Sequence, residues 1–238
     1  MSTDLATQLR EGTKKAHTMA ENVGFVKCFL KGTVEKKSYR RLVEDLYFVY
    51  SALEVELKRH RNHDVISMIY FPELNRKQSL ECDLNYYYGP NWKGEIAPSP
   101  AAQAYVQQIE RVSEQAPELL VAHSYTRYLG DLSGGQILKN IAQRAMRLAD
   151  GAGTAFYEFD EISDEKEFKS VYRQALDNLP IDQADAERIV EEANAAFGMN
   201  MAMFNELEGS LIAAIGKMLF NTLTQRRPRK NTALATAE

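Results

Sequence analysis

The sequence predicts a single all-α domain. Along most of its 238 residues, apolar residues recur at three- and four-residue steps, the spacing that places them on one face of a helix. Hydrophobic residues make up 45% and charged residues 26% of the chain, a balance typical of a globular protein with a substantial core. Strand-like segments are scarce: the one candidate is AFYEF, residues 155–159, which we expect to be an extended loop.

The first two helices are expected from their start signals and apolar stripes. Thr3 is a typical N-cap residue and should begin the first helix. The small and apolar positions of this helix are Leu5, Leu9, Gly12, Ala16 and Ala20. A stronger pattern runs from Glu35 to His60. Its apolar positions are Tyr39, Leu42, Leu46, Val49, Leu53 and Leu57.

A further helix is expected to begin at Ser99 and Pro100, with serine as the N-cap and proline at the first helical position. Its buried face should consist of Ala102, Tyr105, Ile109 and Val112.

The C-terminal third should hold two more helices. Ser163 and Asp164 should cap a helix that runs to about Asn178. A long helix should start at Asp182 and run to about Leu207 or beyond.

Three glycines interrupt a helical pattern in residues 119–144, LLVAHSYTRYLGDLSGGQILKNIAQR. Gly130, Gly134 and Gly135 would each cost about 1 kcal/mol relative to alanine inside a helix. Two interpretations are open. Gly130 ends one helix and the polar residues after it cap another, or a flat ligand lies against the main chain where side chains would collide with it.

Several classes of site are excluded because the chain lacks the sequence motifs that they require. GDLSGG, residues 130–135, lacks the Gly-Lys-Ser/Thr of a phosphate-binding loop, and Asp131 replaces the first glycine of a nucleophile elbow. No histidine has a glutamate three residues before it, as a di-iron bundle requires. Cys28 and Cys82 form no CxxC pair, which argues against a disulfide framework or a zinc knuckle.

Charge and hydropathy limit the partners. A net charge of −4 argues against nucleic acid. The polar N-terminus resembles no secretory signal, and the apolar run SLIAAIGKMLF is too short to span a bilayer. We therefore expect a soluble, cytoplasmic protein with no membrane partner. Residues 1–222 should form the domain and residues 223–238 a disordered tail.

Two histidines are candidate metal ligands. His17 lies on the first expected helix, and His123 lies on the glycine-bearing segment as its rival. His60 and His63 lie near a helix end and should be solvated.

Two other groups have both a structural and a ligand-binding interpretation. Lys169 and Arg173 are four residues apart and either belong to an exposed charge ladder with Glu165 and Asp177 or bind an anionic ligand. A second stripe either belongs to the core or forms a ligand wall; it consists of Phe197, Asn200 and Phe204.

Taken together, these segments resemble haem oxygenase. Residues 119–136 match the signature of that family throughout. The resemblance continues through LREGTKKAHTMAENVGF, YFPELNRKQSLECDLNYYYGP, FKSVYRQAL and IVEEANAAF, and covers about residues 3–210. The ending lacks the hydrophobic span of membrane-anchored members, so the chain is similar to the soluble cyanobacterial and plastid type.

The resemblance implies a multihelical fold with haem b between a proximal helix and a kinked distal helix. His17 would be the iron ligand, and Glu21 would orient its imidazole. Gly130 and Gly134 would let the distal backbone approach the ring, and Asp131 would hold a water network that delivers protons.

Other site residues are likewise implied by the resemblance. The hydrogen-bond partners that would support the distal network are Tyr50, Tyr125, Thr126 and Arg127. The cations that would hold the propionates are Arg10, Lys169 and Arg173. Position 10 is arginine where relatives often have lysine, which keeps the charge and changes the bonding geometry. The pocket would be lined by Phe25, Val26, Phe29, Phe197, Asn200 and Phe204.

The implied activity is oxidative opening of haem by O₂ at a meso carbon, giving biliverdin IXα, ferrous iron and CO. Haem would be both substrate and cofactor, with electrons from ferredoxin. A basic docking face for that donor could consist of Lys14, Lys15, Lys36, Lys37, Arg40 and Arg41, which could equally be solvated surface. A monomer that supplies a bilin reductase in phycobilin synthesis, for photosynthesis, is the implied context. A haem carrier or sensor without turnover, and a helical interaction protein without haem, are the alternatives.

Overall fold

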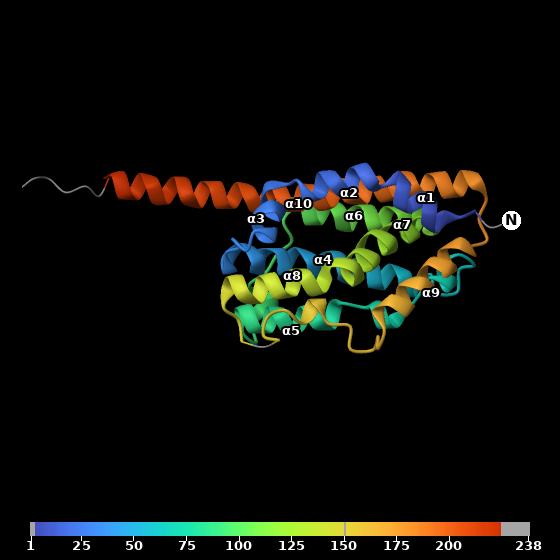
Figure 1. The fold of residues 1–238 in the computed structure, drawn as a ribbon, viewed down its shortest axis with the longest axis horizontal. Helices are drawn as coiled ribbons and strands as arrows, with labels where there is room; N and C mark the ends of the chain where they lie inside the picture. The colour runs from blue at the N-terminus through green and yellow to red at the C-terminus, as the bar shows by residue number, and fades with distance from the viewer. Residues whose placement is uncertain (1–2, 150, 225–238) are drawn as a thin grey trace, which may run out of the picture.

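The computed structural model describes residues 3–149 and 151–224, with side chains as far as Leu207. Within these ranges the chain forms helices and connecting turns and no strand, which confirms the all-α prediction. The helices stack into an elongated bundle, and the C-terminal helix α10 runs along one long side and extends beyond the others (Figure 1).

The helices follow the chain in a simple order. The α-helices are α1 (Leu5–Gly12), α2 (Lys14–Glu21), α3 (Gly24–Leu30), α4 (Lys36–Arg59), α5 (Lys77–Tyr88), α6 (Pro100–Gln115), α7 (Leu120–Ser124), α8 (Gly130–Met146), α9 (Glu165–Asp177) and α10 (Gln183–Thr224). The short 3₁₀ turns are η1 (Ile66–Met68), η2 (Pro72–Leu74), η3 (Trp92–Gly94), η4 (Pro117–Leu119) and η6 (Ala155–Tyr157). A π-helical turn, η5 (Tyr125–Leu129), joins α7 to α8.

Helix α4 forms the centre of the core. Its apolar stripe is buried as expected, and the helix packs against α5, α6 and α10. Along the other side of the bundle, α10 packs against α1, α2 and α3 (Figure 1). These contacts hold the N-terminal helices over the middle of the molecule.

Two of the expected N-caps are confirmed. The Ser99 hydroxyl accepts a hydrogen bond from the Ala102 amide at 3.1 Å, with Pro100 at the first helical position. The cap of α9 is Asp164, whose carboxylate accepts from the amides of residues 166 and 167. Each cap satisfies helix-end N–H groups that would otherwise lack a partner.

The first expected helix is divided at Thr13 into α1 and α2. The Thr13 hydroxyl donates to the Leu9 carbonyl at 2.7 Å, a local bond that competes with regular helix geometry and bends the chain. The N-cap is Asp4, not Thr3 as expected. The division lets α2 take a direction of its own beside α10.

Two other expectations can be compared with the structure. Helix α10 continues to Thr224, which agrees with an end at Leu207 or beyond; residues 223–224, assigned to the tail, are helical, and residues 225–238 lie outside the described part of the chain. The 155–159 segment begins with the 3₁₀ turn η6 in place of a fully extended loop. No helix in the described ranges is both long and apolar enough to cross a bilayer.

We predict that one buried carboxylate of α4 makes stability depend on pH. Glu44 is 2% exposed, and burial raises its pKa from 4.5 to about 7 although Arg41 opposes the shift. The folded state thus binds this proton more tightly than the unfolded state. The contribution of Glu44 therefore falls as pH rises from about 4.5 to about 7 and is level above that range.

Glu44→Gln should raise the free energy of unfolding at pH 8 by about 1–3 kcal/mol and leave it unchanged at pH 4. Urea denaturation at both pH values measures the difference. An equal gain at pH 4 would contradict the assignment.

Candidate functional site

A cavity with two compartments lies among α2, the η5–α8 segment and α10. The larger compartment has a volume of about 540 Å³ and the smaller about 210 Å³. They adjoin, because the same residues line both: His17, Thr126, Gly130 and Phe197. A cavity of this size suits a substantial organic ligand.

His17 lies at the junction of the two compartments. Its ring packs edge-on against Phe197 at 5.7 Å between centroids, and its Nδ1 lies 3.6 Å from Glu21 Oε1, one helical turn away. The imidazole is largely exposed to the cavity and to solvent. One ring nitrogen thus has a carboxylate beside it, as the resemblance implies, and the ring itself borders the ligand space.

The other histidines lie elsewhere. His123 is fully buried, with Nε2 3.0 Å from a carboxylate oxygen of Glu192 and its ring against Tyr105, and it does not line the cavity. His60 and His63 were expected to be solvated, but both are half-buried. His60 Nε2 lies 2.9 Å from the hydroxyl oxygen of Ser113, because the end of α4 meets α6 there. Of the two candidate ligands, only His17 faces the cavity.

The glycine-bearing segment is one continuous helical path with a π-helical turn. Gly130 has φ −64° and ψ −48°, so it does not end a helix, and α8 has no side-chain cap. The interpretation in which Gly130 ends one helix and a polar residue after it caps another is therefore wrong. The segment instead contains the wider turn η5, which no glycine or proline pattern predicted.

The glycines of α8 differ in their surroundings. A Cβ added at Gly130 or Gly134 would meet no atom within 4 Å. A Cβ at Gly135 would lie 3.5 Å from Cδ1 of Tyr157, an ordinary packing contact. Gly130 lines both compartments, so this face of α8 presents bare main chain to the cavity.

A buried polar network borders the smaller compartment. The Tyr50 hydroxyl donates to the Asp131 carboxylate and accepts from Arg127 Nε at 3.0 Å. Arg127 Nη1 donates to Asn200 Oδ1 at 2.5 Å, and its Nη2 lies 3.9 Å from Asp131. Side chains from α4, α8 and α10 thus converge on the guanidinium of Arg127, which lies on η5.

Burial shifts the pKa values of this network. It raises the pKa of Asp131, which Arg127 partly opposes, and raises the pKa of the Tyr50 hydroxyl well above its usual range. Burial alone would lower the pKa of Arg127, but Tyr50 and Asp131 outweigh it and raise that pKa. The network therefore has a permanent cation, a tyrosine that remains a donor and a carboxylate able to exchange a proton.

Two neighbouring residues of η5 border the larger compartment. Tyr125 is half-buried and hydrogen-bonds Thr13, and burial raises the pKa of its hydroxyl. The Thr126 hydroxyl is buried and has no hydrogen-bond partner among the described residues, although Thr126 lines both compartments. A buried polar atom without a partner beside an empty space is typical of a position that a ligand or its waters complete.

The cations lie only partly where the resemblance implies. Arg10 and Arg173 line the larger compartment. Lys169 does not: its ammonium donates to the carbonyl of Leu132 at 3.1 Å. Lys14 lines the compartment in its place, and its spacing of four residues after Arg10 and three before His17 could have indicated this.

The six residues expected to line the pocket all border the smaller compartment. Six more lining residues were not expected from the sequence. Ala20 lies on α2, and the other five come from elements that only the fold brings together: Leu42, Leu46, Leu138, Phe156 and Tyr157.

The fold and the cavity together define a helical protein whose cavity lies between an imidazole and a bare helix face, with cations along its larger compartment. Comparison with known proteins agrees with this class. The sequence model of the family described as "Heme oxygenase" matches residues 3–206. The chain belongs to the haem oxygenase family.

Individual relatives cover nearly the whole chain. "Heme oxygenase 1" of Nostoc sp. is 69% identical over 238 residues, which is 100% of both chains. The heme oxygenase of the alga Porphyra purpurea is 55% identical, again over 100% of both. The crystal structure of heme oxygenase-1 from the cyanobacterium Synechocystis, in complex with heme, superposes with a TM-score of 0.88 at 70% identity. That superposition covers 92% of this chain and 99% of that one.

We predict that Gly130→Ala stabilises the ligand-free protein by about 1 kcal/mol, because helical alanine is favoured over glycine and the new methyl meets no atom within 4 Å. Gly153→Ala is the contrasting control. Its φ of +70° and a Cβ only 2.6 Å from Tyr86 and Tyr87 atoms should make it destabilising. Urea denaturation of both variants measures the two signs, and destabilisation by Gly130→Ala would contradict an open space at that face.

Proposed function

We propose that this chain binds haem b and opens it oxidatively at a meso carbon, giving biliverdin IXα, ferrous iron and CO. The observation that supports this most is the placement of His17 on α2 opposite Gly130 and Asp131 on α8, across one cavity. Haem supplies both the iron that activates O₂ and the ring that is oxidised. The side chains of this protein are proposed to hold the ring, orient it and deliver protons.

His17 is proposed to hold the ring from the α2 side. A neutral imidazole coordinates through one nitrogen when the other is held by a hydrogen-bond acceptor, and Glu21 is placed to accept from Nδ1. The exposed position of His17 leaves Nε2 for the metal. Because α8 offers no side-chain ligand at Gly130, the α8 side of the cavity would leave room for O₂ when haem is bound.

The α8 side is proposed to control proton delivery. The main chain at Gly130 would limit the space on the α8 side of a bound haem and so restrict which meso carbon can be oxidised. The Asp131 carboxylate, held by the Tyr50 hydroxyl, can accept and release a proton at the edge of this space. Arg127 fixes Tyr50 and compensates the carboxylate charge.

The larger compartment is proposed to receive the propionates. Arg10, Lys14 and Arg173 place three cations around it, which favours the anionic edge of the ring there and the apolar edge beside Phe25 and Phe204. The asymmetry fixes the rotation of the ring in its plane and hence the carbon that is attacked. Lys169 is proposed to contribute indirectly, by holding α8 through the Leu132 carbonyl.

Electrons are proposed to come from a ferredoxin, an acidic protein that would dock on basic side chains. Five of the six candidate cations are exposed, namely Lys14, Lys15, Lys36, Lys37 and Arg41. Arg40 is half-buried and stacks on Tyr88 at 4.6 Å. We propose a cytoplasmic monomer that passes biliverdin to a bilin reductase in phycobilin synthesis.

His17→Ala should abolish the absorption spectrum typical of histidine-ligated haem, because no other described histidine faces the cavity. His123→Ala is the matched control and should leave that spectrum intact, since His123 faces Glu192. Titration with haem followed by absorption spectroscopy distinguishes the two. The opposite pattern would move the ligand to His123.

Asp131→Ala should retain haem binding and lose most biliverdin formation, on the order of tenfold to a hundredfold, because a positioned proton donor is removed. Single-turnover assays with haem, O₂ and a reductant would follow biliverdin absorption. Full biliverdin yield would refute the role of Asp131, and unchanged haem in the wild type after electron supply would indicate a carrier.

Lys36→Glu combined with Lys37→Glu should lower the rate of ferredoxin-supported turnover, more at low salt than at high salt, because steering by opposite charges is screened by ions. Turnover with a small chemical reductant should not change. Lys58→Glu, at the other end of α4, is the control and should leave both rates unchanged. Equal losses with the chemical reductant would contradict a docking role.

A further inference from the structure

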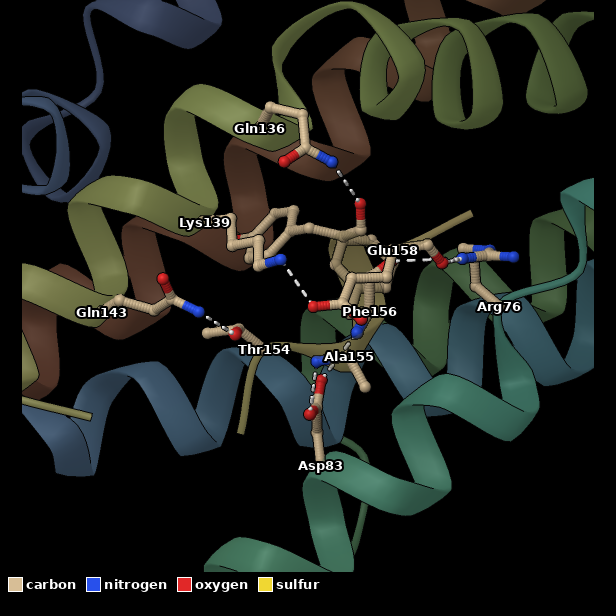
Figure 2. Close-up of polar contacts among 10 residues, drawn as sticks. Arg76, Asp83, Gln136, Lys139, Gln143, Thr154, Ala155, Phe156 and Glu158 are labelled. Carbon is tan, nitrogen blue, oxygen red and sulfur yellow. Dashed lines mark hydrogen bonds and ion pairs between the residues drawn. The ribbon is translucent and has the colours of Figure 1, made fainter. Parts of the chain in front are cut away.

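The segment after α8 returns across the molecule and lies between α5 and α8. We call residues 154–159, which include η6, the strap. Figure 2 shows the polar side chains that contact the strap. On one side they come from α8, and on the other they are Asp83 of α5 and Arg76, the residue just before α5. The strap packs against both helices.

From the α8 side, three residues spaced by three and four positions hold the strap (Figure 2). The pairs are Gln136 Nε2 with the Tyr157 carbonyl at 3.3 Å, Lys139 Nζ with the Glu158 carboxylate at 2.5 Å, and Gln143 Nε2 with the Thr154 hydroxyl at 3.1 Å. This spacing places all three on one face of α8, and Tyr157 packs beside Gly135 of the same helix.

From the opposite side, Asp83 of α5 binds the strap through hydrogen bonds. Its Oδ1 accepts from the Ala155 amide at 2.8 Å and its Oδ2 from the Phe156 amide at 2.9 Å, while the residue is 1% exposed. Arg76 adds hydrogen bonds to the carbonyls of Phe156 and Glu158. One carboxylate therefore satisfies two consecutive buried N–H groups, each of which would be costly to leave without a partner.

The strap also borders the site. Phe156 and Tyr157 line the smaller compartment, and the Phe156 ring packs edge-on against Tyr50 at 5.4 Å between centroids. Tyr50 in turn donates to Asp131. A displacement of the strap would therefore change both the wall of the cavity and the position of Tyr50 in its network with Asp131.

Helix α8 needs such support because its cavity face is empty. Apart from the adjoining η5, the elements against which it mainly packs are α3 and the strap turn η6. A side chain at Gly130 or Gly134 would meet nothing within 4 Å, so no packing at these two positions sets the course of α8. The contacts with α3 and the strap must set it.

We propose that Asp83 is a positioning residue: by fixing the Ala155 and Phe156 amides it holds the strap, and through the strap it sets the height of α8 over the ring. This inference rests on the proposed function only for its consequence in catalysis. The claim that Asp83 holds the strap, and through it α8, applies to the protein without any ligand.

Asp83→Asn tests the proposal, because it replaces one accepting oxygen by an NH₂ group that would face a backbone N–H donor to donor. In the haem-free protein, hydrogen–deuterium exchange should become at least tenfold faster in residues 130–140 and 154–159 and stay unchanged in α6. In the haem-loaded protein, the biliverdin should change from one isomer to a mixture, with KM for haem changed less than kcat.

Asp45→Asn is the matched control. Asp45 is 3% exposed and accepts from the Ser99 amide at 2.9 Å, far along the chain from the strap. It should lower the urea midpoint and leave α8 exchange and the isomer ratio unchanged. If it accelerates α8 exchange as much as Asp83→Asn does, the effect is global and the proposal is overturned.

The double variant Gln136→Ala, Lys139→Ala releases the strap from its other side and removes no fully buried group. It should reproduce the exchange pattern of Asp83→Asn, which keeps the test available if that variant does not fold. Unchanged exchange in residues 130–140 for either variant overturns the proposal. Absence of biliverdin from the wild type would instead defeat the proposed function and leave the exchange result standing.

Discussion

The structure depends on one constraint: a helix must present main chain, without side chains, to a cavity that an imidazole borders from the other side. Gly130, which lines both compartments, meets the first part at a cost of about 1 kcal/mol relative to alanine. Such a helix cannot be positioned by packing on its open face. Its course is therefore set by the π-helical turn before it, and we propose that the strap behind it contributes.

A second constraint is electrostatic. Arg127 is buried, and a buried cation is tolerated only when hydrogen bonds and opposite charge compensate its lost hydration. Tyr50, Asp131 and Asn200 provide that compensation from three different helices. The network thus exists only when α4, α8 and α10 are packed correctly, so the integrity of the core and the chemistry of the site are linked.

The two compartments differ in the chemistry of their walls. The larger has cations at its border and the smaller is walled mainly by aromatic and aliphatic side chains, which suits a ligand with one anionic and one apolar edge. Position 14 belongs to this arrangement and position 169 does not, although both are lysines on helices near the site. The direction of each helix, and not its composition, decides which lysine borders the cavity.

By itself, the sequence determined whatever depends on neighbours along the chain: the helical stripes of α4 and α6, the caps at Ser99 and Asp164, and the one-turn spacing of His17 and Glu21. It also indicated the glycine-bearing segment, and left two explanations of it open. The tertiary structure decided the π-helical turn and the role of Asp83 as a partner of a distant loop. It also decided that Lys14, and not Lys169, lines the larger compartment. These features depend on which helices approach each other, and no local pattern encodes a contact between residues 72 positions apart.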